Sequence, residues 1–113
     1  VMRSGGTFFF TVPFLWPLHD VPYDEHRYTP FAMERMLKDA GFKDIVVTPH
    51  GGWNASLAQM IGLWVTRKPM TTRRRAILKR LTFPIVRSLL RNDSIGNLAH
   101  GPMITGLSGT AVK

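Results

Sequence analysis

The sequence of 113 residues contains no cysteine, which excludes disulfide bonds, thiolate metal sites and a thiol nucleophile. It also lacks a long hydrophobic run, because the longest one, residues 57–65, is far shorter than the ~20 residues that a membrane-spanning helix requires. No stretch resembles a secretory signal, so we expect a cytoplasmic chain, with a peripheral membrane location as an option. A hydrophobic content of 44% with 19% charged residues is typical of a folded domain.

Acidic side chains are missing from the middle of the chain. Residues 45–92 carry nine Lys or Arg residues and no Asp or Glu, whereas the whole chain carries 15 basic and 7 acidic residues. This one segment therefore accounts for the net charge of +8. Such an asymmetry favours an anionic partner.

Periodicity and end signals predict an α/β order of three strands and three helices. The expected strands are 7–12, 42–48 and 103–112, and the expected helices are 29–40, 55–66 and 72–91. Aromatic residues at both odd and even positions predict that the first strand is covered on both faces. We divide the chain into a core of residues 1–53, a basic helical insertion of residues 54–102 and a final strand of residues 103–113, all in one partial domain.

The helix ends carry recognisable signals. Thr29 suits an N-cap, Pro30 suits the first helical position, and Gly41 provides a left-handed end. Asn54 is expected to cap the second helix, and Pro84 to kink or split the third. The apolar stripes expected to be buried are Met33, Met36, Leu37 and Ala40; then Leu57, Met60, Ile61, Trp64 and Val65; then Ile77, Leu81, Ile85 and Leu89.

Three phrases, MRSGGTFFFTVPF, RYTPFAMERMLKDAGFKDI and MITGLSGTAVK, resemble the C-terminal half of a class I S-adenosylmethionine-dependent methyltransferase. In that family an LKPGG turn precedes the fifth strand, and a helix ending in AGF leads to the sixth. The seventh strand returns antiparallel between these two. The resemblance implies a partial Rossmann-like sheet in the order first, last, middle. Arg3-Ser4 departs from the Lys-Pro of the family turn.

The glycine-rich cofactor loop of that family is absent from this sequence. Gly51-Gly52 follows a strand but lacks a third glycine and a downstream acidic residue, and the second glycine pair, Gly106 and Gly109, lies near the end of the chain. The sequence also begins at Val1, within a segment that resembles a turn. We therefore expect a fragment that is inactive alone and binds no cofactor, with S-adenosylmethionine serving the complete enzyme.

The loop after the first strand is dense in titratable side chains. By its position the resemblance implies that it faces the substrate, with His19 as a candidate general base that Asp24 orients. The candidate substrate-binding residues are Pro13, Trp16, His19, Asp24, Arg27 and Tyr28. The alternative is structural, with Asp24 and Arg27 pairing to hold the loop. A metal site of His19, Asp24 and His26 has only a weak signal, and His50 and His100 read as surface residues.

The basic insertion has three interpretations. It is a solvated helix face whose apolar stripe docks on the sheet, an amphipathic helix on an anionic membrane, or a nucleic-acid contact. The candidate anion-binding residues are Arg73, Arg74, Arg75, Lys79 and Arg80. The alternative to a methyltransferase fragment is thus a non-enzymatic binding module. The unpaired edge of the first strand predicts self-association into a homo-oligomer.

Overall fold

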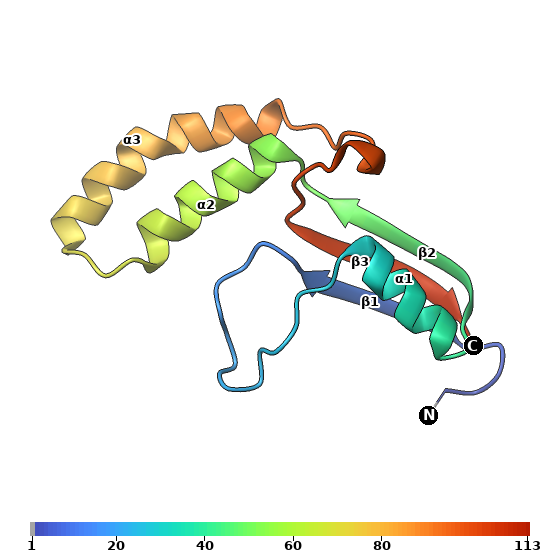
Figure 1. Ribbon diagram of the computed structural model, residues 1–113. Helices are drawn as coiled ribbons and strands as arrows, with labels where there is room; N and C mark the ends of the chain where they lie inside the picture. The colour runs from blue at the N-terminus through green and yellow to red at the C-terminus, as the bar shows by residue number, and fades with distance from the viewer. Residues whose placement is uncertain (1) are drawn as a thin grey trace. The chain divides into compact units, whose positions relative to one another are not determined.

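The computed structural model describes residues 2–113 and divides them into two compact units. The sheet unit contains residues 2–50 and 105–113, and the helical unit contains residues 51–104. The elements, in chain order, are β1 (Thr7–Pro13), α1 (Pro30–Asp39), β2 (Lys43–His50), α2 (Trp53–Arg67), α3 (Thr72–Arg91), a short 3-10 helix (Leu98–His100) and β3 (Gly106–Val112) (Figure 1).

The sheet unit has three strands in the order β1-β3-β2. The last strand, β3, lies in the middle and is antiparallel to both neighbours, with Phe10 and Val47 both opposite Gly109. It follows that β1 and β2 run parallel to each other, and that α1 connects them. The predicted α/β class, the three strands and the central antiparallel position of the last strand are confirmed.

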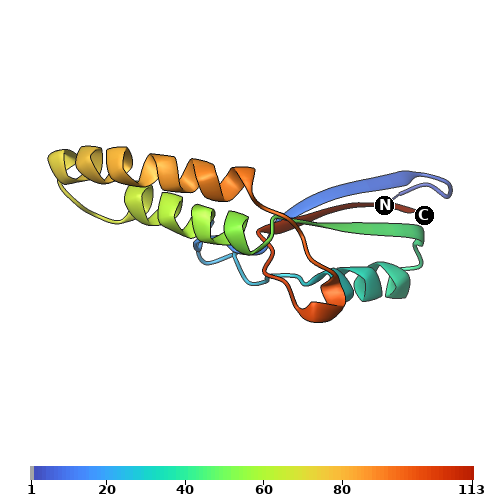
Figure 2. The same cartoon turned by 90° about the horizontal axis from the view of Figure 1, so that it is seen from above.

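One face of the sheet is covered by α1, which packs against β2 (Figure 2). The side chains of β1 alternate accordingly, since Phe10 is 8% exposed and its neighbour Phe9 is 69% exposed. The expectation that β1 is covered on both faces is therefore wrong for the described residues, because only alternate positions face the helix. The core of this unit consists of Phe10, Met33, Leu37, Leu107 and Ala111.

The predicted ends of α1 are confirmed. Thr29 Oγ1 accepts a hydrogen bond from the Ala32 backbone N–H at 3.2 Å, Pro30 occupies the first turn, and Gly41 has φ +77°. The predicted stripe is narrower than expected, because Met36 is 48% exposed and Ala40 lies at the exposed end of the helix. Because α1 is short and packs on an edge strand, only those of its side chains that point directly at the sheet are buried.

The helical unit is an antiparallel pair of α2 and α3, here called the hairpin (Figure 1). Its first helix begins at Trp53, with Gly52 as N-cap, so the expectation of an Asn54 cap is wrong. The cap comes instead from Asp93, whose carboxylate accepts the backbone N–H groups of Gly52 and Ala55, each at 2.8 Å. A carboxylate at a helix N-terminus satisfies free donors and complements the helix dipole.

The second helix of the hairpin, α3, is continuous from Thr72 to Arg91 in spite of Pro84, so the helix is not split there. Its more buried positions recur at helical spacing: Arg75, Leu78, Thr82, Val86 and Leu89. Apart from Leu89, the predicted stripe is therefore wrong. The face of α2 toward α3 includes the small or branched residues Ala58, Gly62 and Val65. Ala58 and Val65 are buried, Gly62 borders open space, and the larger apolar side chains of α2 remain outside the helix contact.

Candidate functional site

The loop of residues 14–29 lies at the carboxyl ends of β1 and β2. Pro13 and His50 both pair with Gly106, so these two strands end at the same edge of the sheet. The backbone N–H groups of Phe14 and Leu15 donate to the carbonyl of Thr105, at 3.0 and 3.1 Å. Ligands of open α/β sheets bind at this kind of edge, outside the carboxyl ends of the strands.

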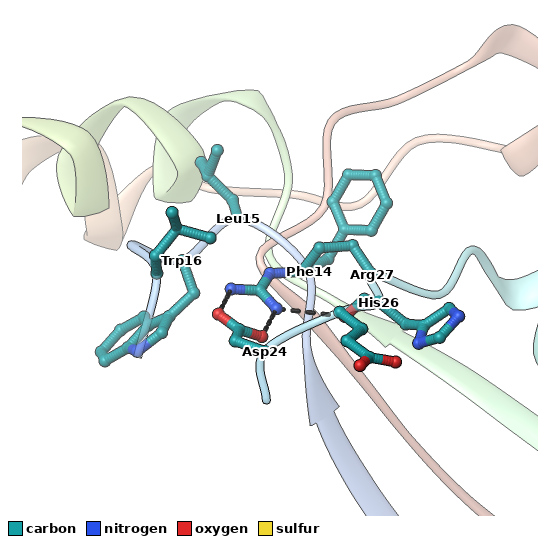
Figure 3. Close-up of a pocket in the computed structure, with 8 residues that line it drawn as sticks. Phe14, Leu15, Trp16, Asp24, His26 and Arg27 are labelled. Atoms are coloured by element: carbon teal, nitrogen blue, oxygen red, sulfur yellow. Dashed lines mark hydrogen bonds and ion pairs between the residues drawn. The ribbon is translucent and has the colours of Figure 1, made fainter. Parts of the chain in front are cut away.

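The centre of the loop is a two-point ion pair between Asp24 and Arg27 (Figure 3). Arg27 Nη2 donates to Asp24 Oδ2 at 2.6 Å, and Arg27 Nη1 donates to the other carboxylate oxygen. Arg27 also donates to the carbonyl of Pro17, at 3.3 Å, and the backbone N–H of His19 donates to Asp24 Oδ2 at 3.0 Å. The pair thus connects both ends of the loop, and the predicted pairing of Asp24 with Arg27 is confirmed.

The ion pair keeps both Asp24 and Arg27 in their charged forms. Hydrogen bonds from the Arg27 guanidinium, and then from the His19 backbone N–H, hold the pKa of Asp24 well below its ordinary value. The hydrogen bond to Asp24 raises the pKa of Arg27. Asp24, with only 6% of its side chain exposed, is therefore a permanent carboxylate that organises the loop and is not a proton donor at neutral pH.

A hollow of about 300 Å³, the loop hollow, opens beside this ion pair (Figure 3). It is lined by Phe14, Leu15, Trp16, Leu18, Asp24, Glu25, His26 and Arg27. Of the predicted substrate-binding residues, the lining includes Trp16, Asp24 and Arg27 and does not include Pro13, His19 or Tyr28. The hollow combines an apolar wall with ionisable side chains, as small-molecule sites do.

The histidines of the loop lie differently from the sequence expectation. The His19 ring contacts Asp20, with Nδ1 to Oδ2 at 3.1 Å, whereas the hydrogen bond from His19 to Asp24 comes from the backbone N–H and not from the ring. His26 lines the hollow and its ring stacks on Tyr28, with centroids 5.7 Å apart and planes at 8°. Sequence reasoning missed Glu25 and His26 as lining residues, although both belong to the same titratable run.

Among residues 2–113, no three His, Asp or Glu side chains come together in a way that could hold a metal ion. His50 lies on the open face of the sheet, with Nε2 2.6 Å from Ser108 Oγ. Within the described chain, no helix is both long and apolar enough to cross a membrane.

The candidate anion-binding residues all belong to α3. Arg73, Arg74, Lys79 and Arg80 are exposed, whereas Arg75 is half-buried and its Nη2 donates to the Lys68 carbonyl at 3.1 Å. Lys79 also lines a second hollow, of about 240 Å³, between α2 and α3. Four of the five side chains are therefore free to meet an anionic surface.

Comparison with known proteins gives no relative. No family model, no curated protein and no solved structure matches this chain.

The ion pair predicts a specific dependence of stability on pH. Because the folded-state pKa of Asp24 is depressed, its stabilising contribution is complete above the unfolded pKa of ~3.9 and is lost as the pH falls toward the folded value. Asp24→Asn is expected to lower the free energy of unfolding at neutral pH and to weaken its decline below about pH 4. Urea unfolding at several pH values measures both effects.

The matched controls are Arg27→Gln and the double variant Asp24→Asn/Arg27→Gln. A double-mutant cycle should give a favourable coupling energy at neutral pH that shrinks in acid. Additive effects at every pH would show that the pair does not stabilise the loop.

Proposed function

We propose that this chain forms the substrate side of a Rossmann-like, S-adenosylmethionine-dependent methyltransferase domain. The observation that carries the proposal is the strand order. Two parallel strands, β1 and β2, are joined by α1, and β3 lies antiparallel between them. This is the arrangement implied by the resemblance of MRSGGTFFFTVPF, RYTPFAMERMLKDAGFKDI and MITGLSGTAVK to the C-terminal half of the family.

The residues of this chain do not fit the cofactor itself. Gly51-Gly52 is the glycine pair that follows a strand, but a Cβ on Gly52 would lie 2.1 Å from the Ser94 carbonyl oxygen. The space that such a glycine could leave for a ligand is thus filled by residues 93–94 of the same chain. We therefore derive no step that involves the cofactor, and assign its binding to a part of the domain outside this sequence.

The proposed task of this chain is to position the methyl acceptor. The loop hollow would bind the acceptor between the apolar wall of Phe14, Leu15 and Trp16 and the ionisable side chains of Glu25 and His26. The ion pair of Asp24 and Arg27 holds the loop in shape. A histidine is a suitable base for a hydroxyl or amine acceptor, and His26 and His19 are the two candidates.

The proposal includes self-association. Among the described strands, β1 has a hydrogen-bonded neighbour on one side only, which is β3. Exposed strand edges pair readily with other chains. We therefore propose that this edge pairs with a second copy, or, in a complete domain, with a further strand of the sheet.

The test is the coding sequence upstream of Val1. The proposal requires that the reading frame continue into a strand, a glycine-rich turn and an acidic residue that suits a ribose hydroxyl. A frame that is closed immediately upstream would contradict it.

A further inference from the structure

The outer side of α2 is a row of large apolar residues. Trp53, Leu57, Met60 and Trp64 recur at spacings of four, three and four, which places them on one face of the helix. Each side chain is between 42% and 66% exposed. Ala58 and Val65, each 2% exposed, lie on another face of α2, which is turned toward α3. An apolar row of this length that stays about half exposed in the described helical unit indicates a binding surface.

A second row lies on α3. Ile77, Leu81 and Ile85, spaced by four, are each more than half exposed. In an antiparallel pair of right-handed helices, this row and the α2 row flank the helix contact from the same side. The second hollow, which Lys79, Thr66 and Phe83 line, lies on the other side of the contact. The two rows therefore form one surface, the hairpin face: Trp53, Leu57, Met60, Trp64, Ile77, Leu81 and Ile85.

Basic residues border the hairpin face at its tip. Five of the nine basic residues fall between positions 67 and 75, at the tip where α2 turns into α3. Lys68 Nζ lies over the Trp64 ring, 5.5 Å from its centroid, which places a positive charge directly beside the apolar surface. The helical unit contains a single acidic residue, Asp93, and its carboxylate caps α2. Within residues 51–104, nine basic side chains thus stand against one carboxylate.

We propose that the hairpin is an interfacial membrane anchor whose apolar face rests in the surface of an anionic lipid bilayer. Tryptophan beside aliphatic residues suits the boundary between headgroups and acyl chains, and basic residues at its border attract anionic lipid. A nucleic acid would neutralise the arginines but would leave the aliphatic side chains of the hairpin face, such as Leu57, Ile77 and Leu81, in water. The inference is independent of the proposed methyltransferase role.

The test is binding to phosphatidylcholine vesicles with and without phosphatidylserine, at low and high salt. A Trp16→Phe background leaves Trp53 and Trp64 as the tryptophans of the chain, so their fluorescence reports on the hairpin face. We expect a blue shift and co-sedimentation with vesicles that contain phosphatidylserine. Both should weaken in high salt, because the ions screen the attraction.

A matched pair of substitutions locates the contact. Leu81 and Leu90 are the same residue type on the same helix, 62% and 55% exposed. Leu90 follows Phe83 by seven residues, which places it on the same side of α3 as this lining residue of the second hollow. Leu81→Gln is expected to reduce the vesicle partition coefficient by about tenfold, and Leu90→Gln by less than about twofold. Circular dichroism should show equal helix content, since both positions are exposed.

Three results would overturn the proposal. The first is no binding to phosphatidylserine vesicles at low salt, and the second is equal loss in Leu81→Gln and Leu90→Gln. The third is a dimer in sedimentation velocity that Leu81→Gln dissociates, because the hairpin face would then be covered by a second copy. Failure here would leave the upstream reading frame, and with it the proposed function, unaffected.

Discussion

Gly109→Ala is expected to destabilise the sheet unit by about 3 kcal/mol, because the new methyl group has no space. A Cβ at this position would lie 2.2 Å from the Val46 carbonyl oxygen and 2.5 Å from Phe10 Cζ. The aromatic ring can turn aside, but the carbonyl belongs to the backbone of the neighbouring strand. β2 must therefore move away from β3, and the Phe10 ring must turn out of its place in the core.

Hydrogen exchange measures this effect strand by strand. Backbone amides of β1, β2 and β3 should exchange faster in Gly109→Ala. The denaturant concentration at which the sheet unit is half unfolded should also be lower. The control is Gly62→Ala, since a Cβ on Gly62 meets nothing within 4 Å. This change should stabilise α2 by about 0.5–1 kcal/mol. Unchanged protection of the sheet in Gly109→Ala would show that β2 and β3 are not packed as described.

Gly52→Ala is expected to release the N-terminus of α2. The added Cβ would lie 2.1 Å from the Ser94 carbonyl oxygen and 2.9 Å from Asp93 Oδ1. The residues that supply the cap would have to move, and both 2.8 Å hydrogen bonds from Gly52 and Ala55 to Asp93 would be lost. The expected loss is about 2 kcal/mol for the cap, with a similar cost for the steric overlap.

The matched control lies in the same connection. Gly96→Ala adds a Cβ that meets nothing within 4 Å, so it should leave helix content and stability nearly unchanged. Asp93→Asn tests the charge separately, since the amide oxygen still accepts one hydrogen bond but no longer complements the helix dipole. Circular dichroism at 222 nm and exchange of the first-turn amides of α2 provide the readout. Equal melting of Gly52→Ala and Gly96→Ala would exclude the Asp93 cap.

Local signals predicted the elements of this fold well. Thr29, Pro30 and Gly41 act within a few residues of the helix end that they define, so α1 could be placed from the sequence. The cap of α2 could not, because Asp93 is 41 residues away from Gly52 and only the folded chain brings them together. Asn54 has the right chemistry and is nearer, but its side chain donates to the Asn92 carbonyl instead.

Amphipathic stripes were the weaker signal. Hydrophobic periodicity identifies a face of a helix but does not tell what the face meets, and here the largest apolar side chains of α2 and α3 remain outside the helix contact. Leu81 and Trp64 were expected in a core and lie on an open surface, whereas the small Ala58 is almost fully buried. The same limit applies to the loop of residues 14–29. Its many titratable side chains suggested a functional site, but the sequence does not tell which histidine borders the hollow, because that depends on how the ion pair folds the loop.

Calorimetric titration with S-adenosylmethionine is the most direct measurement of the central claim, that this chain is the acceptor side of a domain whose cofactor site is elsewhere. The chain of 113 residues is expected to give no binding heat, and the product of the reading frame extended upstream is expected to bind the cofactor. Micromolar binding by the chain alone, or no binding by the extended product, would contradict the account.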